Sequence, residues 1–262
     1  MLRSRLKRML RRLGYDVHHY RPDSSAEARF MTMLAHHRIN LVFDVGANVG
    51  QFAKSLREDG YAGRIVSFEP VSASWDKLVE ASSGDPLWEV APRCAIGEED
   101  GEVEMHVSKN TVSSSILGML DTHLEAAPDS AYVREEITPL RRLDTLAPEY
   151  LRPDSNLFIK IDTQGYESQV LRGAQQLLDR TVGIHAELSL APIYEGQSLY
   201  DELIAYLAAR GFAMWDMNPS FGNMQTGRLL CIDATLFRCS PGNPGEFGPS
   251  GKANRSHCVH DA

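Results

Sequence analysis

The sequence predicts an α/β fold, built on a mostly parallel sheet with helices on both faces. Short apolar runs typical of buried strands alternate with segments whose apolar residues recur at helical spacing. One such run, LVFDV at 41–45, enters the turn DVGANVG, which is typical of the corner between a strand and a helix. The 262 residues suffice for one large domain, and the 43% hydrophobic content is ordinary for a globular protein.

Two helices are expected before the alternating pattern, in a segment over residues 1–38. The sequence SSAE at 24–27 is a capping-box signature and predicts a helix that ends near residue 37. Ahead of it, six of the first twelve residues are basic, and they predict a short basic amphipathic helix over 2–13. This helix either contacts an anionic membrane surface or packs, partly solvated, on its own domain. Its apolar residues are Leu2, Leu6, Met9, Leu10 and Leu13.

The main domain is expected over residues 39–239. Its apolar runs and helical spacings predict strands that alternate with helices, as in a parallel sheet. The expected strands are 41–45, 64–68, 88–96, 157–162, 183–188, 213–217 and 231–237. The expected helices are 51–58, 73–81, 168–178 and 198–210.

Two segments depart from this alternation. Residues 101–150 contain the alternating run EVEMHV, the serine-rich run NTVSSSIL and an acidic, proline-containing stretch, which we interpret as an insertion in the domain. Residues 240–262 are rich in Gly, Pro, Ser and Asn, and this composition predicts a disordered tail.

Charge excludes one large class of partners. The formal net charge is −8, and beyond residue 12 it is −14, from 21 basic and 35 acidic residues. Such a body would repel a phosphate backbone, so nucleic acid is not expected as a partner. No apolar run has membrane-spanning length, the N-terminus lacks signal-peptide features, and the four cysteines lack metal-type spacing. We therefore expect a cytoplasmic protein, with peripheral contact at the inner membrane face through residues 2–13.

The glycine turn after the first strand indicates a ligand site, because ligands of parallel sheets bind at the carboxyl ends of strands. Dinucleotide sites use G-x-G-x-x-G, whereas this turn has G-x-x-x-G preceded by Asp44. A carboxylate is unfavourable beside pyrophosphate and favourable beside an ammonium group or a ribose hydroxyl. A cationic nucleoside fits, and S-adenosylmethionine is one. The alternative is a strand–helix corner without a ligand.

The next two strands support a nucleoside. Glu69 ends the run SFEP roughly 20 residues after the turn, where an acid can accept both ribose hydroxyls, and Pro70 fixes the exit of the chain. The third strand leads into CAIG, whose Cys94, Ala95 and Ile96 either lie beside an adenine ring or pack in the core.

The fourth and fifth strands carry charged residues at their carboxyl ends. Alternation in LFIKIDTQGYE places Lys160 and Asp162 on one face, and GIHAELS places His185 and Glu187 on one face. If the strands are neighbours, Asp162 and Glu187 lie close to each other and to the donor.

Six segments resemble, in this order, those of FkbM-type S-adenosylmethionine-dependent methyltransferases: FDVGANVGQF, SFEP, CAIG, SSSIL, RRLDTL and IKIDTQGYESQVLRGA. The resemblance covers about residues 40–238. It implies a seven-stranded Rossmann-like sheet with one antiparallel strand. It also implies O-methylation, commonly of sugar hydroxyls in glycolipids, polysaccharides or glycosylated natural products. Gln164 departs from the pattern, since the family often has Glu there.

The turn, the strand ends and the resemblance together define an expected donor site for S-adenosylmethionine. The serine-rich run contributes a hydroxyl for the donor or the acceptor, although a plain serine turn is the alternative. The expected donor-binding residues are Asp44, Gly46, Ala47, Asn48, Gly50, Glu69, Pro70, Ala95, Ile96, Ser114 and Asp162.

Asp162, Glu187 and His185 are the expected catalytic residues, because an alcohol is a poor nucleophile until its proton leaves. A general base supplies about 10²–10⁴-fold. Three arrangements stay open. One carboxylate is the base; or both hold a divalent cation such as Mg²⁺; or Asp162 binds the donor's amino group while Glu187 orients the sugar. Lys160 and His185 are equally explained as structural neighbours of these carboxylates.

The acceptor is expected among the loops 108–140, 190–197 and 217–226. Tyr194, Lys160 and Trp215 are the expected substrate-binding residues, with simple packing as the alternative for both aromatic rings. The acceptor is expected to be a small-molecule or lipid-linked sugar. N-methylation, nicotinamide-dependent oxidoreduction and a non-catalytic scaffold are the competing functions, and the sequence makes no prediction of oligomeric state.

Overall fold

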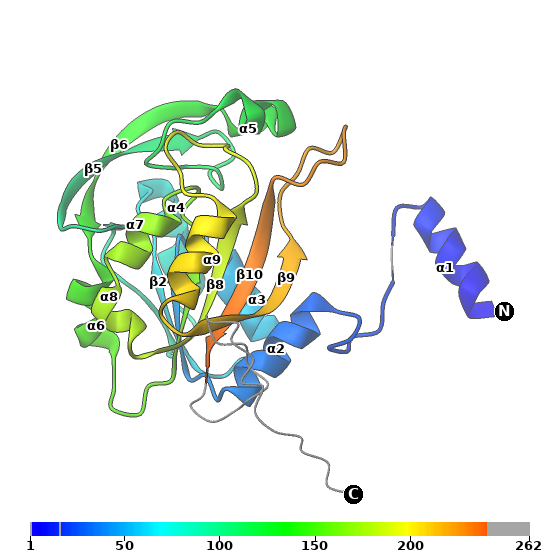
Figure 1. Cartoon of the computed structure of the whole chain (residues 1–262), viewed down its shortest axis with the longest axis horizontal. Helices are drawn as coiled ribbons and strands as arrows, with labels where there is room; N and C mark the ends of the chain where they lie inside the picture. The colour runs from blue at the N-terminus through cyan, green and yellow to red at the C-terminus, as the bar shows by residue number, and fades with distance from the viewer. Residues whose placement is uncertain (1, 16, 240–262) are drawn as a thin grey trace, which may run out of the picture.

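A seven-stranded sheet with the order β3-β2-β1-β7-β8-β10-β9 forms the centre of the computed structural model, which describes residues 2–15 and 17–239 (Figure 1). The pairs β3–β2, β2–β1, β1–β7 and β7–β8 are parallel, and β10 is antiparallel to both of its neighbours. The expected mostly parallel sheet with one antiparallel strand is thus confirmed. The strands are β1 (Leu41–Val45), β2 (Arg64–Phe68), β3 (Trp88–Val90), β7 (Leu157–Ile161), β8 (Thr181–Ser189), β9 (Phe212–Pro219) and β10 (Cys231–Arg238).

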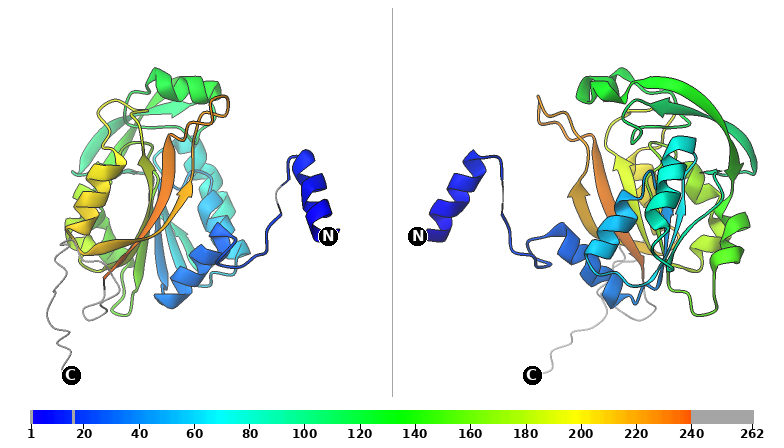
Figure 2. Two further views of the ribbon diagram at one scale, coloured as in Figure 1. Left: turned by 45° about the vertical axis from the view of Figure 1, so that its right-hand side comes forward. Right: turned by 180° about the vertical axis from the view of Figure 1, so that it is seen from behind.

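Two apolar layers cover the sheet, because alternate residues of β1 face opposite sides. Leu41, Phe43 and Val45 belong to a core shared with α6 (Leu143–Tyr150), α7 (Glu167–Arg172), α8 (Gln175–Leu178) and α9 (Tyr200–Ala208). Val42 belongs to the opposite core, with α2 (Ala26–His36), α3 (Gln51–Glu58) and α4 (Ser72–Ser82). Helices therefore lie on both faces of the sheet, as Figure 2 shows.

Two expected elements are each divided in the structure. The expected strand 88–96 becomes β3 and the short β4 (Ala95–Ile96), because Pro92 between them has no N–H to continue a ladder. The expected helix 168–178 becomes α7 and α8, which are separated at Gly173. A Cβ atom at Gly173 would lie 1.8 Å from the carbonyl oxygen of Gly97, so this close packing requires glycine.

The segment 101–150 supplies two of the three strands of a second sheet, whose order is β4-β6-β5. This sheet consists of β4, β5 (Gly101–Ser108) and β6 (Tyr132–Arg141), with α5 (Asp121–Ala126) and the short 3₁₀ helix Pro128–Ser130 between the two long strands. Figure 1 shows this layer above the carboxyl ends of the central strands. Met105 and Val107 of β5 pack against Val71, which lies just beyond β2.

The N-terminal helix α1 (Leu2–Arg12) stands apart from the rest of the chain in every view of Figures 1 and 2. Among residues 2–15 and 17–239, no helix is long and apolar enough to span a membrane. Cys94, Cys231 and Cys239 are free thiols. The expected disordered tail over 240–262 lies outside the described residues.

Candidate active site

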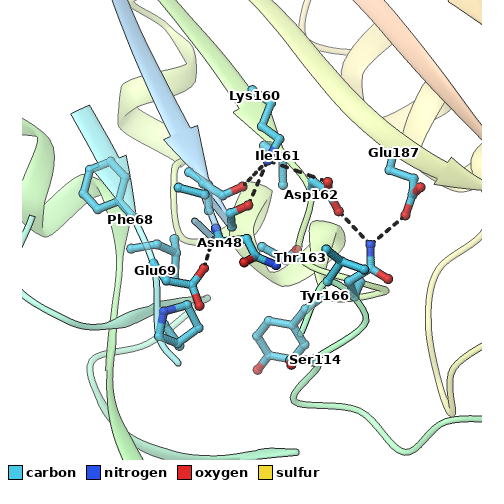
Figure 3. Close-up of a pocket in the computed structure, with 18 of the residues that line it drawn as sticks. Asn48, Phe68, Glu69, Ser114, Lys160, Ile161, Asp162, Thr163, Tyr166 and Glu187 are labelled. Carbon is cyan, nitrogen blue, oxygen red and sulfur yellow. Dashed lines mark hydrogen bonds and ion pairs between the residues drawn. The ribbon is translucent and has the colours of Figure 1, made fainter. Parts of the chain in front are cut away.

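A cavity of about 280 Å³ lies at the carboxyl ends of the central strands. The strand order reverses between β1 and β7, and this switch point is where open α/β sheets bind their ligands. Among the expected donor-binding residues, all but Asp44 and Gly50 line the cavity. Figure 3 shows Glu69 and Glu187 at opposite sides of it. We call the part near Glu69 the donor side and the part near Glu187 the acceptor side.

The two glycines of the turn serve chain packing. Gly46 has φ +75°, and a Cβ atom there would lie 1.9 Å from the carbonyl oxygen of Asp162. Gly50 has φ +82°, and a Cβ atom there would lie 2.6 Å from the Trp88 ring. The two glycines are therefore required by the close packing of the turn on the end of β7 and on Trp88.

Asp44 lies beneath the donor side, in a polar row that crosses three strands. The register places Asp44 between Ser67 and Lys160 on the neighbouring strands. Asp44 is fully buried, with Oδ1 3.1 Å from Lys160 Nζ, and Ser67 Oγ donates a hydrogen bond to its Oδ2. Asp44 can therefore influence a ligand only through its neighbours.

Lys160 connects the glycine turn to the end of β7. Its Nζ donates to the carbonyl oxygen of Gly46 at 2.9 Å and lies 3.7 Å from Asp162 Oδ2. Burial acts to lower the pKa of Lys160, but the charges of Asp44 and Asp162 outweigh burial and raise that pKa. Lys160 is thus a buried cation that fixes the turn, in addition to lining the cavity.

Glu69 carries the polar chemistry of the donor side. It is 5% exposed; its Oε2 accepts the N–H of Asn48 at 2.8 Å and its Oε1 accepts the N–H of Val71 at 2.9 Å. Burial raises the pKa of Glu69 to about 7, against the opposing effect of these two N–H groups. Each carboxylate oxygen retains a further lone pair, which a ribose hydroxyl can use.

The donor side fits S-adenosylmethionine. The Asn48 side-chain oxygen is buried and has no hydrogen-bond partner among the described residues, which leaves an acceptor for a polar ligand group. Glu69 supplies a carboxylate for the ribose. The remaining wall is apolar and suits an adenine ring; it consists of Val71, Cys94, Ala95, Ile96, Met105 and Ile116.

The acceptor side is a group of carboxylates from three adjacent strands. Asp162 follows β7, Glu187 lies in β8, and Asp233 of β10 is the register partner of Glu187. Gln164 Nε2 donates to Asp162 Oδ1 at 2.7 Å and to Glu187 Oε2 at 3.0 Å, and Ser220 Oγ donates to Glu187 Oε1 at 2.8 Å. The sheet thus brings together the two carboxylates expected from the sequence.

Burial and repulsion from neighbouring negative charges raise the pKa values of two of these carboxyl groups, Glu187 and Asp233. The pKa of Glu187 is raised well above its ordinary value by burial, and further by the negative charges of Asp162 and Glu167. Burial also raises the pKa of Asp233 to about 6. A carboxylate whose pKa approaches the working pH is the better general base.

His185 lines the same wall but is held as a neutral ring. Burial, together with the charge of Lys160, lowers the pKa of His185 to about 4. Its Nδ1 lies 2.9 Å from Thr235 Oγ1, and the ring stacks on Phe52 with centroids 6.1 Å apart. At neutral pH His185 is therefore a weaker proton acceptor than Glu187.

Two of the expected substrate-binding residues lie outside the cavity lining. Tyr194 is 1% exposed and donates its O–H to Gln164 Oε1 at 2.8 Å, so its ring presents no open face to a sugar. Trp215 lies in β9 and packs against His37 and Phe237.

Four lining residues of the acceptor side, Phe52, Gln164, Ser220 and Asp233, were not among the expected site residues. A signal existed for Asp233, because it is an acid within the otherwise apolar strand CIDATLF. For Phe52 and Ser220 the sequence contains no comparable signal, because neither residue type is unusual at its position.

The expected metal ligands have another partner. Asp162 and Glu187 share the amide of Gln164, and a cation between them would have to displace it. Within the described part of the chain, the metal-binding group that the geometry permits is Glu104, His106 and Glu135, on the surface of the second sheet.

Comparison with known proteins gives a family match over most of the chain and likenesses to solved structures at low sequence identity. The family model described as Methyltransferase FkbM domain matches residues 44–214. No curated protein has a sequence close enough to match. A candidate tRNA (m1A22) methyltransferase from Streptococcus pneumoniae, in complex with S-adenosyl-L-methionine, is 11% identical, with a TM-score of 0.45 over 85% of this chain and 75% of that one. An rRNA methylase from Streptococcus thermophilus is 12% identical, with a TM-score of 0.43 over 84% and 98%.

Proposed function

The chain belongs to the FkbM methyltransferase family and is an S-adenosylmethionine-dependent methyltransferase, and from this premise we propose that it methylates a sugar hydroxyl. The sugar is part of a glycolipid, a polysaccharide or a glycosylated natural product. The observation that carries the proposal is the Glu187 carboxylate, which lies on the acceptor side with a strongly raised pKa. A hydroxyl acceptor needs such a base.

In this proposal, Glu187 accepts the proton of the acceptor hydroxyl. The bound donor supplies an activated methyl group, which is transferred to the acceptor oxygen while the carbon–sulfur bond breaks. Ser220 and Gln164 each donate to one oxygen of Glu187 and hold the carboxylate in place. Positioning of the reacting groups contributes further, because fixed orientation removes much of the entropic barrier.

The carboxylates also favour a polyol over an apolar acceptor. The side chain of Asp162 is 40% exposed, so its oxygens are accessible to hydroxyl groups of an acceptor. Phe52, beside His185, offers a ring face to the non-polar side of a sugar. N-methylation is the second candidate, because the same carboxylates would bind an ammonium group. Since a neutral amine needs no base, the loss of Glu187 would then matter less.

The test is incubation with isotope-labelled S-adenosylmethionine and a total lipid and polysaccharide extract, followed by mass spectrometry of the labelled product. We expect an O-methylated sugar, and at least about a hundredfold less product from the Glu187→Gln variant in the same time. A labelled amine would support N-methylation instead. Tight donor binding without any labelled product would indicate a non-catalytic scaffold, and both results would contradict the proposal.

We also propose that α1 holds the enzyme on the anionic inner face of a membrane, where a lipid-linked sugar is available. The first twelve residues carry six basic and no acidic residues, whereas the remainder carries a net charge of −14. An anionic bilayer would attract the helix and repel the body.

The test for membrane binding is sedimentation with phosphatidylcholine vesicles, with and without phosphatidylglycerol. We expect binding only to the anionic vesicles, with a loss on raising the salt concentration. Deletion of residues 1–14 should abolish binding and leave turnover on a soluble sugar analogue unchanged. Equal sedimentation of the full-length and shortened proteins would refute the role of α1.

A further inference from the structure

Gln164 is held in the cavity through both its backbone and its side chain. Its backbone is left-handed (φ +55°), a conformation that residues other than glycine rarely adopt. Its carbonyl oxygen accepts a hydrogen bond from Ser115 Oγ at 2.7 Å, and its Oε1 accepts one from the Tyr194 O–H at 2.8 Å. Its Nε2 donates to both Asp162 and Glu187. Strained backbone conformations of this kind are concentrated at functional sites, so a functional role for Gln164 is a reasonable hypothesis.

The two carboxylates determine which end of the Gln164 amide faces them, because an ionised carboxylate only accepts hydrogen bonds. Burial raises the pKa of Tyr194 far above its ordinary value, so the O–H remains protonated and acts as a donor. The amide nitrogen of Gln164 therefore faces Asp162 and Glu187, and its oxygen is left to accept the O–H of Tyr194. Figure 3 shows the dashed lines from both carboxylates converging on one nitrogen.

Each oxygen of the two carboxylates has a partner within the protein. Gln164 binds one oxygen of Asp162 and one of Glu187. Lys160 Nζ lies 3.7 Å from the other oxygen of Asp162, and Ser220 Oγ donates to the other oxygen of Glu187. The amide thus reduces the repulsion between two neighbouring negative groups, as a cation between them would.

We propose that Gln164 is a positioning residue that replaces a divalent cation between Asp162 and Glu187. The native site then works without a bound metal ion. The proposal also predicts how a metal site could be made at this position, because Glu has the same shape as Gln and carries a carboxylate in place of the amide. Gln164→Glu would direct a third carboxylate at the same point and create a site for a hard divalent cation. The inference rests on the proposed function only in treating Glu187 as the base.

The decisive experiment needs no acceptor. Binding of Mn²⁺ is measured by electron paramagnetic resonance for the native protein and Gln164→Glu, with calorimetric donor binding as the check that each is folded. The exposed Gln175→Glu variant adds the same charge on α8 and serves as the control. We expect Gln164→Glu to bind Mn²⁺ about tenfold or more tightly than either, because carboxylate number sets cation affinity. Equal binding by all three proteins would overturn the proposal.

If Gln164→Glu fails to fold, Mn²⁺ binding by the native protein still tests the proposal. Mn²⁺ bound to the native protein, and lost in Glu187→Gln, would show that a cation does occupy this position, and the proposal would be wrong. If the native protein binds no Mn²⁺ that depends on Glu187, the result supports the proposal.

Turnover extends the test once an acceptor is in hand. Native turnover should survive exhaustive chelation. Gln164→Glu should lose turnover on chelation and regain it with Mg²⁺, while its donor affinity stays the same. Loss of native turnover on chelation, restored by Mg²⁺, would overturn the inference. If no hydroxyl acceptor is found, the proposed function fails, and the Mn²⁺ result still decides the role of Gln164.

Discussion

The two sides of the cavity are built by different means. The donor side comes from short stretches that follow neighbouring strands, and its central carboxylate, Glu69, is held by the backbone N–H groups of Asn48 and Val71. The acceptor side comes from five separate segments, and its central carboxylate, Glu187, is held by the side chains of Gln164 and Ser220. Backbone donors persist whatever side chains surround them. The hold on Glu69 should therefore tolerate replacement of the Asn48 and Val71 side chains, whereas a change of Gln164 or Ser220 removes a donor to Glu187.

Glu187→Gln is expected to separate the two sides most clearly, because it should lower kcat strongly and leave donor affinity almost unchanged. Removal of the general base should lower kcat by about 10²–10⁴-fold. Donor affinity should stay within about twofold of the native value, because Glu187 lies away from the donor side. The kcat is measured in methyl-transfer assays and the donor affinity by calorimetric titration, both on the same preparation. Near-native kcat would remove Glu187 from the mechanism, and Asp162→Asn would then become the next variant to examine.

Glu69→Gln should produce the opposite pattern. Removal of the charge weakens the expected hydrogen bonds to the ribose, and bonds to charged groups contribute about 1.5–3 kcal/mol. Donor affinity should therefore fall by about tenfold to a hundredfold, with little change in kcat at saturating donor. Calorimetric titration measures the affinity. An unchanged dissociation constant would mean that the ribose lies elsewhere.

The same variant should have a pH-dependent effect on stability. Burial raises the pKa of Glu69 from 4.5 to about 7, so between these values the folded state holds a proton that the unfolded chain releases. The resulting stabilisation is present below the unfolded pKa and is lost as the pH rises through about 7. Gln is neutral at every pH. The Tm of Glu69→Gln relative to native should therefore rise by about 5–10 °C between about pH 5 and about pH 8. A constant difference would contradict the burial argument.

The smallest effect is expected from Trp215→Ala. Trp215 packs at the edge of the sheet against His37 and Phe237, away from the cavity lining. We expect unchanged kcat and donor affinity, with only a modest loss of Tm from the lost packing. A large rise in KM for the acceptor would show that the acceptor extends along β9 to this residue.

The sequence predicted most of the polar residues that line the donor side, because their signals are local. A strand end, a glycine turn and an acid after the next strand are neighbours in the sequence as well as in space. It also identified Asp162 and Glu187, since alternation places them at strand ends. It did not recover Asp233, Ser220 or Phe52, because their place depends on the register of β10 and on how α3 packs. Tyr194 was expected at the surface of the site, but its position beneath Gln164 depends on loop packing that no periodicity reports.

The contacts of Gln164 have a mechanical consequence. Ser115 belongs to the segment inserted between β5 and β6, and Tyr194 belongs to the loop after β8, yet both hold the same residue. Displacement of either loop by an incoming molecule would be transmitted through one amide to the carboxylates beneath. An acceptor that fits poorly and displaces one of these loops would thus move Glu187 away from its working position. The enzyme would then methylate such an acceptor more slowly than one that leaves both loops in place.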